Sequence, residues 1–482
     1  MTRQSISYTP RPFVLAGASL AALLLLPLTA LCQPASQPRS VTLAVCIDDA
    51  MRLNPSILGR AQATEAAIAG RKSVRGSFGP SVVVGGNVTI WDEETVADFG
   101  GAMGTGGADL SLIPQPTTVY ETILYEMLKG FGKPTVVQEQ VTAQLSASVV
   151  QPITPLWTVL KAYQLAGLGI DEARIREEEA RTTVALAVVQ AYLGFLQARS
   201  VVATLEASVV RIEAHQRQME KLHESELVGK SDVLKVKVAA AELAQAMVRT
   251  RNLVELARAN LSTQVGWESG TLVEPLEIEH RLPVPPEGTV DESIRVALSR
   301  RPELQAMRVQ LKQTELGRKI VEAEYIPVVA ASGSYLYNRG STFMDENSFF
   351  LRFDLSWPLW EWGKTFYKAD EAAARTRQLE FAVDQVRDYV ALEVRKTWLD
   401  LQTALEEFRA VEVRVAEAEE NYRVQKKLYE AEYKTSTDLL DAEAALTEAH
   451  AQRDMAFYAA WTASAAYGKA VGSPISSWVP TE

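Results

Sequence analysis

Residues Leu428–Leu446, LYEAEYKTSTDLLDAEAAL, contain a short polar break, Lys434–Thr437, between two long runs of helix-forming residues. Helix formers precede the break from about residue 367 and follow it to about residue 472. The break therefore predicts the bend of a very long helical hairpin. Asp438 and Asp441 are three positions apart just after it, so they lie on one face of the second helix, near an N-terminus that favours carboxylates.

A near copy of this stretch, LHESELVGKSDVLKVKVAA, occupies Leu222–Ala240. Leu428 follows Leu222 by 206 positions, and this offset holds without a gap from residue 151 to residue 266. Farther upstream the offset is 247, since Pro302 corresponds to Pro55. The sequence therefore predicts two tandem repeats, with a 41-residue insertion in the first repeat between residues 80 and 151.

Each repeat is expected to begin with one helix, at residues 41–77 and 290–325, that ends before a proline. Apolar and polar residues then alternate with period two over four segments, which predicts strands at 81–91, 141–149, 329–337 and 349–357. Strands of this length suit a transmembrane β-barrel, and an interfacial girdle could include Trp91, Tyr335, Tyr337 and Trp357. A soluble sheet with one buried face has the same period.

Four strands are too few to close a barrel, because about eight are the minimum. A membrane location would therefore require several chains to share one barrel. Between the first two strands we expect a long outward-facing, glycine-rich loop at residues 92–134.

The longest helices are expected at residues 156–226 and 362–432, each roughly 100 Å long, with return helices at 231–266 and 437–472. Helices of that length indicate a coiled coil or a helical tube rather than a globular core. The remaining segments are a linker at 267–289 and a short tail at 473–482.

The first 35 residues are typical of a signal peptide, with cleavage after Cys32 or Ala35. A lipid-modified Cys32 and an uncleaved membrane anchor are the alternatives for this segment. Cleavage would remove Cys32, so we expect no intrachain disulfide in the mature protein. The net charge of −11 argues against nucleic acid as the main partner.

Catalysis has little support in the sequence. No nucleophile motif is present, and the histidines show no metal-ligand spacing, so we assign His215, His223, His280 and His450 to solvated helix faces. We therefore expect no enzyme activity, no bound metal and no cofactor.

The order of these segments resembles the TolC family of outer membrane efflux proteins, and the family's signature segments stand here as ALSRRPEL, AEYIPVV, LSWPL and the hairpin LYEAEYKTSTDLLDAEAAL. The resemblance implies a mainly α-helical homotrimer. Four strands from each chain would make one 12-stranded barrel in the bacterial outer membrane, continued by an α-helical tunnel across the periplasm, with residues 267–289 in its equatorial region. It also implies a periplasmic adaptor and an inner-membrane efflux pump or secretion ATPase as partners.

By the same resemblance, Asp438 and Asp441 match an acidic pair at the periplasmic constriction. As stacked carboxylate rings they would attract cations and have raised pKa values; the alternative is a plain helix cap. The two hairpin tips would serve adaptor docking and gating through Glu226, Gly229, Lys230, Ser231, Asp232, Leu234, Glu432, Lys434, Thr435, Ser436, Thr437 and Leu440.

Two departures from the family pattern concern these tips. Glu226 and Glu432 stand where the family has glycine, and Lys235 stands in the first hairpin where the second has Asp441. Lys235 is expected to make contacts between helices or to dock the adaptor. The function predicted is an outer membrane channel for efflux or type I secretion, and the alternative is a soluble periplasmic coiled-coil adaptor or scaffold. The cargo is not encoded in any local motif.

Overall fold

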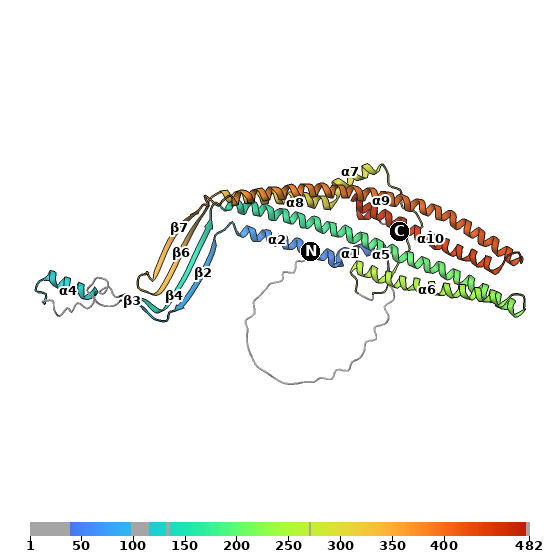
Figure 1. Cartoon of the computed structure of the whole chain (residues 1–482), viewed down its shortest axis with the longest axis horizontal. Helices are drawn as coiled ribbons and strands as arrows, with labels where there is room; N and C mark the ends of the chain where they lie inside the picture. Colours follow the sequence, from blue (N-terminus) through green and yellow to red (C-terminus); the bar gives the residue numbers. More distant parts are fainter. Residues whose placement is uncertain (1–38, 98–114, 132–134, 269–270, 479–482) are drawn as a thin grey trace, which may run out of the picture.

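The computed structural model describes residues 39–97, 115–131, 135–268 and 271–478. The molecule is elongated, with strands at one end and two helical hairpin tips at the other (Figure 1). The predicted signal peptide, with Cys32 and Ala35, lies outside the described residues, as do parts of the loop predicted at 92–134.

Two helices, two long strands and a helical hairpin follow one another, and the same order then recurs. The first set comprises α1 (Leu43–Leu53), α2 (Pro55–Gly76), β2 (Ser81–Ile90), β4 (Thr135–Pro152), α5 (Leu156–Glu224) and α6 (Lys230–Val265). The second comprises α7 (Val290–Arg300), α8 (Pro302–Glu322), β6 (Val328–Ser341), β7 (Asn347–Ser356), α9 (Lys364–Glu430) and α10 (Ser436–Val471). Short elements complete the chain: β1 (Arg39–Val41), β3 (Thr95–Ala97), α4 (Val119–Phe131), β5 (Val273–Pro275), η2 (Ala323–Tyr325) and η3 (Ile475–Ser477).

The single first helix expected in each repeat is wrong, because both are broken in two. Asn54 and Arg301 have extended backbones, with ψ of 123° and 125°, and each precedes a proline that begins the next helix. Proline disfavours helical geometry in the residue before it. Arg301 is 5% exposed and donates to Glu303, Glu393 and the carbonyl oxygen of Ala470, so the second break is tied to the end of α10.

The long strands form an antiparallel sheet in the order β2-β4-β6-β7. The short strand β3 also pairs with β4. The register aligns Val84 with Ala147, Ala147 with Tyr335, and Tyr335 with Phe349. β4 and β6 extend beyond the predicted 141–149 and 329–337, because backbone pairing continues past the alternating segment. The segment 92–134 is not a simple loop, since it also contains β3 and α4.

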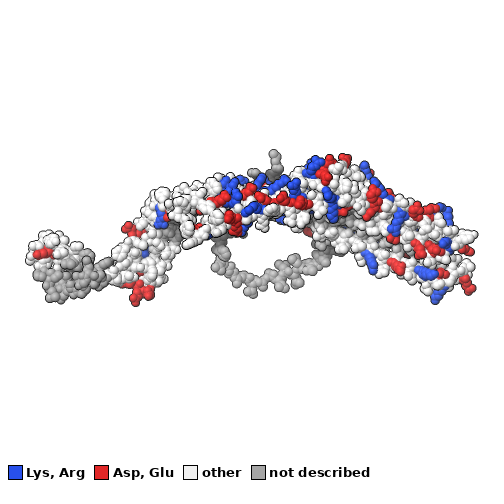
Figure 2. Space-filling view, turned by 45° about the horizontal axis from the view of Figure 1, so that its top comes forward, with Lys and Arg blue, Asp and Glu red and all other residues white. Residues whose placement is uncertain are grey.

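The apolar face of the sheet is not covered by the described chain. Val84 is 68% exposed and Phe353 is 75% exposed, and their neighbours on the same face are also exposed. On the opposite face Gln144 donates to Asn338 (3.2 Å), which is 7% exposed. Figure 2 shows few charged side chains over the visible strands and many over the helices. A soluble sheet with one buried face does not describe this arrangement.

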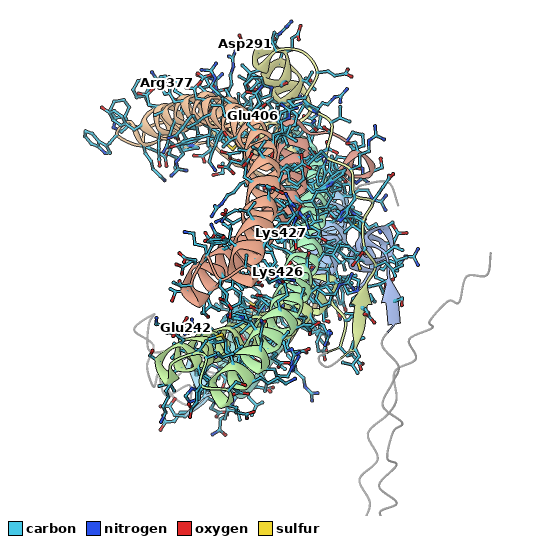
Figure 3. All side chains as sticks on the ribbon, turned by 90° about the vertical axis from the view of Figure 1, so that its right-hand side faces the viewer. Glu242, Asp291, Arg377, Glu406, Lys426 and Lys427 are labelled. Carbon is cyan, nitrogen blue, oxygen red and sulfur yellow. The ribbon has the colours of Figure 1, made fainter. Side chains whose placement is uncertain are left out.

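The main apolar core lies midway along the helices, where α5 packs against α1, α10 and the linker. Tyr192 is 1% exposed and donates to the carbonyl oxygens of Val41 and Leu276 (3.2 and 2.7 Å). The linker strand β5 pairs in parallel with β1, and Trp478 of the tail is buried in the same core. One stretch of α5 is long and apolar enough to cross a membrane, but half of it is buried inside the structure. Viewed from the hairpin tips, the helices lie along an open arc (Figure 3).

Candidate functional site: the hairpin tips and the seam behind them

Both hairpin tips turn through five residues, 225–229 between α5 and α6 and 431–435 between α9 and α10. The predicted break at Lys434–Thr437 is thus displaced, because Thr435 caps α10 and Ser436 and Thr437 already belong to the helix. The two tips lie at the same end of the molecule, opposite the strands (Figure 1).

The glutamates that replace the family's glycines adopt the conformation that glycine usually supplies. Glu226 has φ of 59° and Glu432 has φ of 65°, both left-handed. Each sits in a Schellman turn, in which Leu227 N–H donates to the Leu222 carbonyl oxygen (2.9 Å) and Tyr433 N–H to that of Leu428 (2.9 Å). Glutamate in place of glycine therefore adds strain to the bends but does not alter their geometry.

The two return helices begin differently. Gly229 caps α6 without a side-chain hydrogen bond, whereas Thr435 caps α10 in a capping box with Asp438. The Asp438 carboxylate accepts from Thr435 N–H (2.9 Å) and its hydroxyl (2.8 Å). These hydrogen bonds lower the pKa of Asp438, the backbone one having the larger effect, so in the single chain its pKa moves opposite to the direction expected for a ring.

Asp441, one turn further along α10, is exposed. Among the described residues it makes no side-chain hydrogen bond or ion pair. The two aspartates named from the sequence thus differ: Asp438 is held by the helix end, and Asp441 is free to meet solvent, ions or another chain.

Lys235 of the first hairpin reaches the second. Its ammonium group lies 3.2 Å from an Asp232 carboxylate oxygen and 3.3 Å from the Thr437 hydroxyl. This is the contact between helices that was one of the two expectations for Lys235.

Behind the tips, a row of polar residues joins α5 to the second hairpin, and we call this row the α5–α10 seam. It consists of Ser200, Thr204, Ser208, Arg211 and His215 on α5, and Ser436, Glu443, Thr447 and Asp454 on α10.

At the tip end of the seam, His215 is buried and its Nε2 lies 2.9 Å from the Ser436 hydroxyl. Its ring packs edge-on against Tyr429 (5.3 Å between centroids), whose hydroxyl donates to the sulfur of Met219 (3.0 Å). Burial lowers the pKa of His215. The assignment of His215 to a solvated helix face is therefore wrong.

Midway along the seam, Glu443 is 4% exposed. It accepts from Arg211 Nε (2.5 Å) and from the Ser208 hydroxyl (3.1 Å), and Thr447 donates in turn to Ser208 (2.8 Å). A buried carboxylate needs such partners, because desolvation of an unpaired charge is costly.

At the far end of the seam, Asp454 accepts from Ser200 (2.6 Å) and Thr204 (3.2 Å) and pairs with its neighbour Arg453 (3.0 Å). The spacing of the α5 residues, four, four, three and four positions, places them on one helical face. That spacing was the sequence signal for the seam. Within the described ranges, no cluster of three or more His, Cys, Asp or Glu residues could hold a metal ion.

The fold and the tips define a class of protein: an elongated chain with a strand end that exposes apolar residues and a long hairpin end that carries Asp438 and Asp441. The sequence profile of the outer membrane efflux protein family matches residues 293–473. This segment is therefore similar in sequence to that family, and the described chain as a whole has the fold of the solved outer membrane channels below. Members of this family are bacterial outer membrane channels with periplasmic tunnels that work with adaptor and inner-membrane pump components.

Solved structures agree with the fold over most of the chain. The CmeC outer membrane channel of Campylobacter jejuni matches with a TM-score of 0.70 and 14% identity, covering 89% of this chain and 85% of CmeC. The outer membrane protein VceC of Vibrio cholerae gives 0.70 and 15%, covering 90% and 96%. A membrane protein from Pseudomonas aeruginosa gives 0.72 and 16%, covering 89% and 92%. No curated protein sequence matches the chain significantly.

The left-handed glutamates generate a stability prediction. Glu226→Gly and Glu432→Gly should each stabilise the protein by about 1 kcal/mol, because the relief of left-handed strain exceeds the added freedom of the unfolded chain. The thermal midpoint of the detergent-solubilised protein would rise. Matched controls are Glu224→Gly and Glu430→Gly in the last turns of α5 and α9, which should lower the midpoint. A fall in all four variants would refute left-handed strain at the tips.

The buried pair in the seam generates a second prediction. Arg211→Met should destabilise the protein by about 2 kcal/mol, since it leaves the Glu443 carboxylate buried without its cationic partner. The double variant with Arg211→Met and Glu443→Met should regain much of the lost free energy of unfolding, and a double-mutant cycle of unfolding measurements would show this. The exposed pair of Arg414 and Glu448 is the control, and Arg414→Met should cost less than about 1 kcal/mol. Purely additive losses at Arg211 and Glu443 would contradict the seam.

Proposed function

We propose that this protein is the outer membrane channel-tunnel of a tripartite efflux or type I secretion system, passing cargo from the periplasm to the exterior. One observation supports this most directly: a sheet whose apolar face is exposed lies at one end of helices about 100 Å long. Lipid would cover that face, and the helices would cross the periplasm.

The sheet needs partners at its edges. β2 and β7 are the end strands of the four-strand path, and each has an edge without a partner among the described strands. Open edges are avoided in lipid, where backbone groups have no water to bind. Three chains, each joining its β7 to β2 of the next, would close a 12-stranded barrel.

The helical arc fits the same threefold assembly. One chain forms an open curve of helices (Figure 3), and three such curves would complete a tunnel wall. The recurring element order fits a chain built from two tandem repeats, residues 36–266 and 290–472, joined by the linker at 267–289 in the equatorial region. The leader at 1–35 would direct export, and a lipid on Cys32 would mark an anchored variant of the same channel.

At the periplasmic mouth, the threefold axis would turn Asp438 and Asp441 into two carboxylate rings. Asp441 is the freer ligand for cations, while Asp438 combines a ring position with its capping role. The tip residues around Gly229–Leu234 and Lys434–Leu440 would contact a periplasmic adaptor and gate the mouth. An inner-membrane pump or secretion ATPase would supply the energy.

The alternative, a soluble periplasmic adaptor or scaffold, does not explain the exposed face of the sheet, because its apolar side chains would then lie in water. Membrane fractionation separates the two functions. The channel should remain with outer membranes and require detergent, whereas an adaptor would be released in soluble form.

The acidic rings generate a prediction in planar lipid bilayers. Asp438→Ala combined with Asp441→Ala should lower cation selectivity and raise conductance, because two rings of negative charge and their constriction are removed. Asp441→Asn alone should lower selectivity without changing the thermal midpoint, since it leaves the α10 cap intact. The control is Asp291→Ala on α7, outside the arc of helices (Figure 3). Unchanged ion selectivity in the double variant would remove the acidic rings from the proposal.

A further inference from the structure

A pocket of about 320 Å³ lies where the linker crosses α9 and α10, beside the far end of the α5–α10 seam, and we call it the linker pocket. Its volume is at the small end of the range for ligand pockets, roughly 300–1,000 Å³. The linker is held there by Trp461 of α10, whose indole donates to the Arg281 carbonyl oxygen (3.0 Å). The residues that form most of its lining are His280 and Leu282 of the linker, Phe408 and Glu412 of α9, and Phe457 and Tyr458 of α10.

Aromatic rings form one side of the linker pocket, and Phe457 is at their centre. Its ring lies 6.0 Å from that of Phe408, 5.2 Å from that of Tyr458 and 5.1 Å from that of His280, measured between centroids. His280 thus lies on the linker and contacts a ring of α10, rather than on a solvated helix face. The faces of aromatic rings attract cations, and a group of rings also offers a flat apolar ligand a large contact area.

The Tyr458 hydroxyl has no hydrogen-bond partner among the described residues, although the side chain is only 6% exposed. Buried tyrosines usually find a partner for this group. Burial, helped by the charges of Glu277 and Asp454, raises the pKa of Tyr458 to about 12. The phenol therefore stays neutral at physiological pH, and its oxygen is available to a ligand in the pocket.

The charges that line the pocket leave one carboxylate uncompensated. Asp454 is fully engaged, because it accepts from Ser200 and Thr204 and pairs with Arg453 (3.0 Å). Arg453 also lines the pocket, and its charge is balanced by that of Asp454. Glu412 is exposed and, within the described ranges, makes no side-chain hydrogen bond or ion pair. The open side of the pocket thus carries a free negative charge next to the aromatic rings.

We propose that the linker pocket binds a small organic cation in which an ammonium group is attached to an aromatic ring. The ring would pack against Phe408 and Phe457, while the ammonium group would donate to the Tyr458 hydroxyl oxygen and to Glu412. This site is separate from the proposed acidic rings, because Asp441 lies about 20 Å away along α10. A ligand here would contact the linker and the second hairpin together, so it would hold the linker against α9 and α10.

The test uses the full-length protein in detergent and benzylamine, which is protonated at neutral pH, as the probe. Isothermal titration calorimetry, corrected for titration into micelles alone, should show saturable binding of benzylamine. Benzyl alcohol, which has the same ring without the charge, should bind at least about tenfold more weakly. Benzylamine should also raise the thermal midpoint, since a ligand that binds only the folded chain stabilises it.

Two variants separate the parts of the site. Glu412→Gln should weaken benzylamine binding about fivefold and leave benzyl alcohol unaffected, because it removes only the charge. Tyr458→Phe should weaken benzylamine binding about threefold without lowering the thermal midpoint of the ligand-free protein, since the hydroxyl has no partner to lose. Glu417→Gln is the matched control, because Glu417 is also an exposed glutamate of α9 and does not line the pocket. It should leave both affinities unchanged.

Three results would overturn the proposal. The first is a wild type that shows no saturable binding of benzylamine at millimolar concentration, and the second is equal affinity for benzylamine and benzyl alcohol. The third is binding that survives Glu412→Gln but disappears in Asp441→Asn, because the cation would then bind at the hairpin tips.

Discussion

Two hairpins of this length cannot be held together by one apolar core, because a core fills only the middle of the helices. Towards the tips, a second apolar cluster around Met219 and Val236 is joined by the α5–α10 seam. The central feature of the seam is the buried Glu443 carboxylate with Arg211 and Ser208. Polar contacts of this kind have directional geometry, so they fix the rotation and the axial position of one helix against the other. The placement of Asp438 and Asp441 relative to the first hairpin depends on that alignment, as does the contact of Lys235 with Thr437.

Much of this fold was predictable from sequence, because strand alternation and long helical runs are local patterns. Local patterns also explain the errors. The run from residue 41 to 77 reads as one helix, but the backbone rule at Asn54-Pro55 outweighs propensity. Glu226 and Glu432 gave no sign that their bends would keep a left-handed turn, since the hydrogen bonds of the whole Schellman motif impose it. Glu443 and His215 look like ordinary surface residues in sequence, and only the partner helix 221 to 235 positions away buries them.

Backbone strain is distributed in an informative way. Among the described residues, the non-glycine positions with positive φ are Glu226, Trp362 and Glu432. Two lie at the tips and one lies where the sheet meets the helices, so all three mark the ends of long helices. A long, regular helix tolerates little distortion along its length, and the direction changes have to be made in a few residues. Strain is therefore concentrated at the two ends of the long helices.

The corresponding helices of the two hairpins have nearly equal lengths, and these lengths set how far each tip lies from the sheet. α5 has 69 residues, α9 has 67, and α6 and α10 have 36 each. At about 1.5 Å per residue, losing one turn from α5 alone would shift one tip by about 5 Å and misalign every later contact of the seam. Insertions and deletions must therefore occur in matched sets across four helices, whereas single substitutions are absorbed locally. The fold is shared with CmeC over 89% of this chain at 14% identity.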